Sequence, residues 1–445
     1  MMIDWSKYPL IRLFIPFLLG IIAGYLSIVE WGWTVKAKWT FALTAICVCC
    51  TIASHAIVSK TRYRSKGYIF IMCTSATLFM AGLAFSARSH QQALRLYGRD
   101  YNYEIYRQNN FQNKQAKKWQ EALHQRFAAG GDDRWTEEQA VVESVTIGWR
   151  NGLSKELKQT FARTGISHVL ALSGYHVGIL FLFLFLGPRH WAKTLVGRWA
   201  WHVAILLILW LYALMTGMSP SIVRAVLMCS IITLGKILQR DVRLINSCTL
   251  AAFIMLIIDP LLVGHVGFQL SFCCIVGIAL MEAWLPRHAV LSGTMLSAVC
   301  TFTTFPLVAW HFGSVPLLSL VSNFFAMFLI PVIMLLSGLW WLTALIGSLS
   351  DALTLIPEVA AIPLRWTAWA LIELARCVSH FTYAAIPYRP SLAEVGCWYG
   401  AILATISLCY KTTGKRTIAL LLMLSGVLFA AISRKTGLPL GFFKE

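Results

Sequence analysis

The sequence predicts an all-α polytopic membrane protein of about 12 to 13 transmembrane helices, including one broken helix and one interfacial or re-entrant helix. Apolar residues make up 58% of the 445 residues and charged residues only 13%, which is about half the charged fraction of a soluble domain. Runs of about 20 apolar residues also recur along the chain. No soluble core of this size could bury so much apolar side chain, which excludes a cytosolic enzyme, a disordered chain and a secreted disulfide scaffold.

The apolar runs give the predicted spans in order. They lie near 9–29, 39–58, 67–87, 166–187, 199–218, 221–239, 244–262, 268–285, 289–310, 326–347, 392–410 and 417–433. The first run is too long for the core of a signal peptide and precedes another apolar run, so we expect it to be retained. The segment 357–382 is amphipathic and either crosses the membrane or lies on its surface. Residues 314–325, delimited by Pro316 and Pro331, predict a short re-entrant or interfacial helix.

These spans divide the chain into four parts. Residues 1–87 are an N-terminal region of three transmembrane helices, 88–165 an extracytoplasmic helical segment, 166–347 the central transmembrane bundle, and 348–445 an amphipathic helix with the final spans. Alternate connectors are rich in Lys and Arg, which places the N-terminus in the cytoplasm.

The extracytoplasmic segment is expected to brace the bundle rather than to form a base-reading domain. Trp119, Leu123 and Phe127 recur at four-residue spacing, as on one face of a helix.

The net charge of +19 has two readings. Most of it is the topological signal of the connectors, and the alternative is a contribution to handling a polyanion. All twelve cysteines lie in apolar segments, which predicts packing roles instead of disulfides or a redox pair. We expect no metal and no cofactor.

The stretch 165–180 places polar groups inside a predicted span. His168 and His176 would lie about 80° apart on a straight helix, so both could face one cavity. Ser173 and Gly174 can interrupt the helix, and helices broken inside membranes generally line cavities. Ordinary packing and interhelical hydrogen bonds are the alternative.

Two further segments carry polar residues into spans. Ser219 is a candidate N-cap, Pro220 falls in the first helical turn, and Arg224 lies one turn further. Arg224 either snorkels to the outer headgroups or faces a pore that takes an anionic substrate.

Asp259 and Pro260 precede the third polar segment. Gln269 and Ser271 enter the following span two residues apart, so one could pack while the other lines a cavity.

These motifs together resemble the successive signatures of the ComEC-type competence family. They read G-I-S-H-V-L-A-L-S-G-Y-H-V-G, T-G-M-S-P-S-I-V-R-A-V-L-M, then D-P followed by G-F-Q-L-S-F, after the segment I-G-W-R-N-G-L, and the likeness covers about 140–345. The resemblance implies a channel in the bacterial inner membrane that passes single-stranded DNA into the cytoplasm during natural transformation. By the same resemblance, 166–347 is the competence core.

The chain departs from many members of that family. Residues 88–140 are too few for an OB-fold domain, and the H-x-H-x-D-H cluster of a nuclease domain is absent from the sequence. We therefore expect the transmembrane core alone and no enzyme, with the lipid bilayer, single-stranded DNA, a separate nuclease or DNA receptor outside and a separate motor ATPase inside as partners.

Two other functions stay open. One is a transporter or flippase for another anionic or lipid-linked substrate, which would predict inverted repeats. The other is an intramembrane serine hydrolase that uses Ser173 and His176, because side chains three residues apart on a helix come within reach. In the channel hypothesis, the broken span, the Arg224 helix and the Gln269/Ser271 helix face one polar cavity open to the outside.

Overall fold

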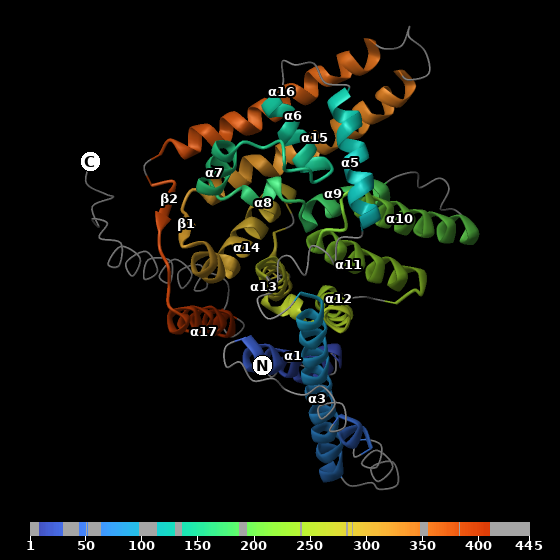
Figure 1. The fold of residues 1–445 in the computed structure, drawn as a ribbon, viewed down its shortest axis with the longest axis vertical. Coiled ribbons are helices and arrows are strands. Elements are labelled where there is room, and N and C mark those ends of the chain that lie inside the picture. The colour runs from blue at the N-terminus through green and yellow to red at the C-terminus, as the bar shows by residue number, and fades with distance from the viewer. Residues whose placement is uncertain are drawn as a thin grey trace. The chain divides into compact units, whose positions relative to one another are not determined.

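A computed structural model describes residues 9–29, 44–49, 51, 64–97, 114–129, 136–186, 194–240, 243–281, 284–286, 288–347, 355–381 and 383–409 of the chain. Its long helices are α1 (Pro9–Val29), α3 (Arg64–Tyr97), α5 (Lys114–Ala129), α10 (Leu195–Met215), α11 (Pro220–Ile237), α12 (Leu244–Ile258), α13 (Val266–Met281), α14 (Ala289–Phe312), α15 (Ser319–Gly347), α16 (Leu355–Ser379) and α17 (Leu392–Cys409). The shorter helices are α6 (Thr136–Thr146), α7 (Lys155–Arg163), α8 (Ser167–Leu170), α9 (Gly174–Leu186) and the 3₁₀ turn η3 (Pro260–Gly264). Two strands, β1 (Ser314–Pro316) and β2 (Ala385–Pro387), complete the described elements (Figure 1).

The described helices confirm an all-α polytopic membrane protein. Four of them, α10, α11, α14 and α15, are long and apolar enough to cross a bilayer, and shorter apolar helices lie in α1, α9, α12 and α13. Large apolar side chains are exposed on these helices, such as Leu207 at 67% and Leu342 at 60%, as expected where lipid replaces water.

The predicted number of about 12 to 13 spans stays a prediction. The span 417–433 and most of 39–58 lie outside the described residues.

The helices group into two compact units. One comprises Lys114–Ala225 and Cys273–Glu445 with Met1, and the other comprises Met2–Asn113 and Val226–Phe272. In the second unit, α1 and α3 approach so closely that a side chain at Gly20 would meet the backbone of Phe79. Small residues commonly allow such close packing between membrane helices. Phe17 and Ile21 of α1 join Met255 and Leu256 of α12 in the core of this unit.

The first unit is built around the pair α15 and α16, which lie side by side with α6 next to them (Figure 1). Its core joins Val141 of α6, Phe161 of α7, Ile333 of α15 and Leu371 of α16, all fully buried. The segment predicted to be extracytoplasmic thus contains the helices α5, α6 and α7, of which α6 and α7 pack on α16. Its location outside the cytoplasm stays a prediction.

The short helix expected over residues 314–325 is not formed, and that prediction was wrong. Gly313 ends α14 in the left-handed conformation with φ 66°, and the chain then enters β1. This strand pairs antiparallel with β2, with Val315 opposite Ile386. The helix α15 begins at Ser319 and continues through Pro331, since the surroundings of a membrane helix can satisfy the backbone groups that a proline frees.

Candidate functional site

The predicted break in the span 166–187 is present. The helix α8 ends at Leu170, Ala171 is extended (φ −95°, ψ 118°), and α9 begins at Gly174. Ser173 precedes α9, and its Oγ accepts a hydrogen bond from the backbone N–H of Tyr175 at 3.3 Å. The Tyr175 hydroxyl donates to the carbonyl of Met327 in α15 at 2.8 Å, which ties the start of α9 to a long membrane helix.

His176 completes the start of α9. Its Nδ1 accepts the backbone N–H of Ser173 at 3.2 Å and lies 3.0 Å from Ser173 Oγ. This arrangement resembles a capping box, in which the side chain three residues into a helix reaches back to the N–H of the N-cap, with histidine in place of Glu or Gln. An imidazole that accepts through Nδ1 carries its proton on Nε2.

The other ring nitrogen of His176 has no hydrogen-bond partner among the described residues. The side chain is fully buried, and Nε2 makes no hydrogen bond with any described residue. A buried donor without an acceptor is unfavourable. The N–H at Nε2 is therefore held in a fixed orientation and is available to any hydrogen-bond acceptor that comes to lie beside it.

The start of α9 packs against the first turns of α11. A Cβ at Gly174 would lie 3.6 Å from Cβ of Ala225, the neighbour of Arg224. Arg224 is 2% exposed, and its NH2 nitrogen donates to Ser221 Oγ at 3.3 Å. The guanidinium is therefore enclosed by protein. It does not snorkel to the surface, which was one of the two alternatives that the sequence offered.

The residues before Arg224 follow the prediction in part. Pro220 is the first residue of α11, as expected. The Ser219 hydroxyl, however, is buried and makes no hydrogen bond with the described residues, so it does not act as the predicted N-cap. The carbonyl of Ser219 instead accepts the N–H of Val223.

His168 differs from His176 in exposure. It is exposed on α8, and its Nδ1 lies 3.2 Å from the carbonyl oxygen of Gly165. The break ends the straight helix on which the two rings were expected 80° apart. The structure thus brings together Ser173, Gly174, His176 and the Arg224 helix, and His168 lies near enough to interact electrostatically with His176. A cavity shared by the two histidines stays a prediction.

Asp259, Gln269 and Ser271 belong to the second compact unit. Asp259 Oδ1 accepts the N–H of Leu261 at 3.1 Å and caps the turn η3. Gln269 Nε2 donates to the carbonyl of Val263 at 2.9 Å, while Ser271 is half-buried on α13. Asp259 and Gln269 thus stabilise the turn between α12 and α13, and their common cavity with His176 and Arg224 stays a prediction.

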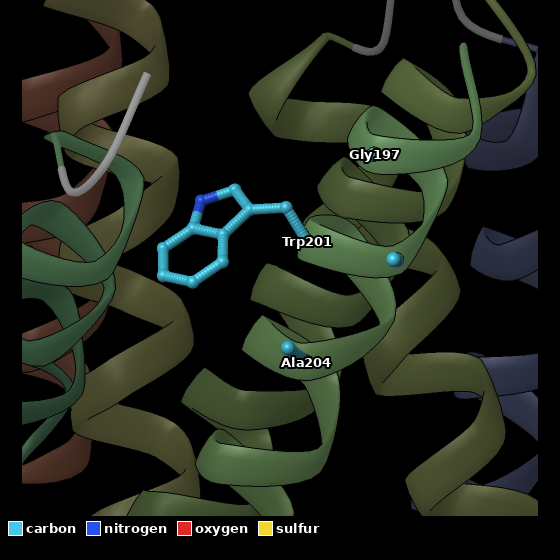
Figure 2. A pocket seen from close by; sticks show the side chains of 4 residues that line it. Gly197, Trp201 and Ala204 are labelled. Carbon is cyan, nitrogen blue, oxygen red and sulfur yellow. The ribbon is translucent and has the colours of Figure 1, made fainter. Parts of the chain in front are cut away.

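A hollow of about 430 Å³ lies along α10. Gly197, Ala200, Trp201 and Ala204 line it, and the Trp201 side chain extends outward from the helix that carries Gly197 and Ala204 (Figure 2). Small residues on a membrane helix leave room for an apolar neighbour.

A second hollow, of about 150 Å³, is lined by Arg150, Leu153, Lys158, Ser167 and Leu170. Neither hollow is lined by His176 or Arg224.

Sequence reasoning missed the cations of the second hollow. Leu157 and Phe161, four residues apart and both buried, mark the inner face of α7, and this pattern could have predicted an amphipathic helix with Lys158 beside that face. Arg150 Nε donates to the carbonyl of Leu170 at 3.1 Å. Partial burial lowers the pKa of Arg150 from its ordinary value, but an arginine still carries its charge at neutral pH.

Within the described ranges, His, Cys, Asp and Glu side chains form no group of three that could hold a metal ion.

Apolar helices, one of them broken beside a buried histidine and in contact with the helix that carries the buried Arg224, define a polytopic membrane protein. The chain belongs to the Competence protein family, whose profile matches residues 145–412, more than half of the chain. This confirms the resemblance to the ComEC-type competence family.

Two curated relatives share part of this region. ComE operon protein 3 of Bacillus subtilis (strain 168) is 29% identical over 198 residues, which are 43% of this chain and 25% of that protein. The uncharacterized protein YcaI of Escherichia coli (strain K12) is 26% identical over 234 residues, 48% of this chain and 30% of that protein. The chain thus matches less than a third of either relative's length. No solved structure matches.

Proposed function

We propose that this chain conducts single-stranded DNA across the bacterial inner membrane into the cytoplasm during natural transformation. The observation that carries the proposal is the broken helix with the half-buried Ser173 and the buried His176, next to the helix of the buried Arg224, inside the region that matches the Competence protein family. Family membership supports a role in DNA uptake, and the polar groups supply the chemistry that a passing phosphate chain needs.

The chemistry follows from the charge of the substrate. A strand of phosphates crossing a bilayer must be met by water, backbone donors and sparse cations, because a dense basic lining would bind it too tightly to release it. The N-terminus of α9 offers the positive end of a helix dipole without a fixed charge. His176 Nε2 offers a neutral donor, and Arg224 a single cation.

The groups are covered in this arrangement. His176 is fully buried, Arg224 is 2% exposed, and Gly174 packs against Ala225. Passage of a strand therefore requires α9 to move away from the first turns of α11. We infer that the described arrangement is the closed state, and that the strand itself or a partner protein stabilises the open one.

The deciding experiment is a deletion strain scored in two separate steps. DNA taken up across the outer envelope is measured as nuclease-protected label, and DNA that reaches the cytoplasm is measured as transformants per unit of label. We expect normal protection and loss of transformants, with restoration by the full chain. Normal transformation in the deletion strain would overturn the proposal.

The proposal includes the location and the partners. We place the chain in the inner membrane with its N-terminus in the cytoplasm, served by a separate nuclease or DNA receptor outside and a motor ATPase inside. A thiol-reactive probe that cannot cross the inner membrane tests the orientation. It should fail to label a cysteine introduced at Lys7 and should label one introduced at Lys155, which lies in the segment predicted to be extracytoplasmic.

One observation favours a second candidate, the intramembrane serine hydrolase. Ser173 Oγ lies 3.0 Å from His176 Nδ1, which is the distance of a nucleophile from its base. A hydrolase also needs a group that orients the histidine, yet no described residue bonds His176 Nε2. The same Nδ1 accepts the N–H of Ser173, so the pair fits a helix cap better. Labelling of Ser173 by a fluorophosphonate probe would reverse this preference.

A further inference from the structure

The hollow between α7 and α8 places two cations around one small space. Arg150 precedes α7, Lys158 lies on it, and Ser167 is the first residue of α8. Arg150, Lys158 and Ser167 are exposed, while Leu153 and Leu170, which also line this space, are buried. Segments separated by up to seventeen positions in the sequence thus contribute an arginine, a lysine and a serine to the lining of the same hollow.

Neither cation, Arg150 or Lys158, is paired with a carboxylate of the residues that the structure describes. The only hydrogen bond of the Arg150 side chain to described residues runs from Nε to the carbonyl of Leu170. This bond fixes the plane of the guanidinium and leaves its two terminal nitrogens available, which is the geometry that binds phosphate oxygens bidentately.

The hollow is open to its surroundings and has room for a small anionic group. Its volume of about 150 Å³ corresponds to roughly five water molecules at about 30 Å³ each. This space accommodates a phosphate group together with one or two waters, and its apolar floor of Leu153 and Leu170 gives no hydrogen bonds to the edge of a nucleobase.

We propose that the hollow lined by Arg150, Lys158 and Ser167 binds one phosphate group of a nucleic-acid backbone without reading its bases. The choice of a nucleic acid over a lipid headgroup rests on the proposed function. Arg150 is bonded to Leu170, the last residue of α8, so a phosphate held here lies beside the break that leads to Ser173 and His176. The hollow is thus a first contact point for the strand.

The test uses the full-length chain in nanodiscs of neutral phosphatidylcholine and a fluorescent oligothymidylate, with anisotropy followed at increasing salt. Arg150→Gln and Lys158→Gln should each weaken binding about ten-fold at low salt. Each should also reduce the logarithmic salt slope by about 0.7, the value expected for one lost phosphate contact to a single strand. Lys155→Gln is the matched control, because Lys155 is exposed on the same helix and does not line the hollow. It should change binding by less than two-fold.

A second arm tests the phosphate itself. An oligothymidylate with a neutral methylphosphonate backbone should bind weakly and equally to the unchanged chain and to Arg150→Gln. Equal affinities of Arg150→Gln, Lys158→Gln and Lys155→Gln for the ordinary strand would overturn the proposal, as would no binding by the unchanged chain. Strand binding that depends on Arg150 and Lys158 only in nanodiscs that contain anionic lipid would assign the hollow to a lipid headgroup. That result would also overturn the proposal.

The binding assay separates this inference from the proposed function. Suppose that Arg150→Gln loses strand binding and that the deletion strain transforms normally. The channel function would then be overturned, and the phosphate site in the hollow would be supported. Transformation that requires the chain, combined with strand binding that ignores Arg150 and Lys158, would keep the channel and overturn the hollow.

Discussion

The backbone N–H of Ser173 donates to Nδ1 of His176 across 3.2 Å, so the His176 ring closes the start of α9. This bond fixes the ring orientation and leaves the proton on Nε2, an atom that is buried and has no acceptor among the described residues. The break between α8 and α9 and the oriented Nε2 donor of His176 therefore depend on the same hydrogen bond. Changes at the two residues should have different consequences, because Ser173 supports the helix and His176 presents the donor.

Ser173→Ala should lower stability more than it lowers transport. The change removes the hydroxyl that accepts the N–H of Tyr175 but keeps the backbone N–H that His176 accepts. Loss of an N-cap side chain costs about 1 kcal/mol, which thermal unfolding of the detergent-solubilised chain can measure. Ser173→Asn retains an N-cap acceptor and should recover most of this loss. Full stability with complete loss of transformation would instead give the hydroxyl a role in chemistry.

Arg224→Gln should leave a folded, inserted protein and reduce DNA import at least ten-fold. In the proposed function Arg224 supplies the only cation of the described site around His176, and a glutamine keeps a polar group near Ser221 while removing the charge. Arg224→Lys keeps the charge and should retain more import than Arg224→Gln. The measurements are transformants per unit of protected DNA and protein level in the membrane fraction.

His176→Ala tests the neutral donor in the same assay. Import should fall at least ten-fold while the protein level stays normal, because the ring bonds only through the cap at Ser173 among the described residues. If His176→Ala and Arg224→Gln both lower the protein level before they lower import, the two residues serve only to hold helices together, and the conduction path lies elsewhere.

His124→Ala tests the packing of α5 on α6. His124 Nδ1 lies 2.7 Å from Oε2 of Glu143, a carboxylate that is almost fully buried, and its ring stacks on Trp149 at 4.4 Å. Removal of the ring leaves this carboxylate with Gln139 as its remaining side-chain partner among the described residues, which should cost about 1 to 3 kcal/mol. Glu121→Ala, an exposed change on the same helix, should cost less than about 0.5 kcal/mol. Equal unfolding temperatures of the two variants would contradict this account.

The long elements were predictable from the sequence because lipid imposes a simple rule on them. A helix that crosses hydrocarbon needs about 20 apolar residues, and the runs near 199–218 and 289–310 accordingly became α10 and α14. The break in the span 166–187 was predictable as well, since Ser173 and Gly174 interrupt an otherwise apolar run.

The errors arose where a distant segment determines the local structure. Residues 314–316 form a strand because they pair with 385–387, about seventy positions later. No local sequence pattern predicts this pairing. The hollow with Arg150 and Lys158 was missed for a similar reason: it exists only where α7 packs beside α8, so the sequence shows two ordinary surface cations.

The last prediction concerns the turn between α7 and α8, which positions this hollow. Gly165 has φ +77°, a conformation that residues with a Cβ rarely adopt. A Cβ there would also lie 2.6 Å from Cβ of Ser319 and 2.8 Å from Cγ of Pro316, closer than van der Waals contact allows. Gly165→Ala therefore combines backbone strain with a clash and should cost at least about 2 kcal/mol, measured as a lower unfolding temperature and a lower protein level.

Gly178 is the matched control for Gly165. It lies within α9, and a Cβ there would meet nothing within 4 Å. Because alanine favours a helix interior by up to about 1 kcal/mol over glycine, Gly178→Ala should be neutral or slightly stabilising.

Strand binding at Arg150 and Lys158 should weaken in Gly165→Ala, even at temperatures where the protein stays folded, since α8 can no longer hold its place beside α7. Gly165→Ala with normal stability and normal strand binding would show that the turn can relax, and that the hollow does not depend on this conformation.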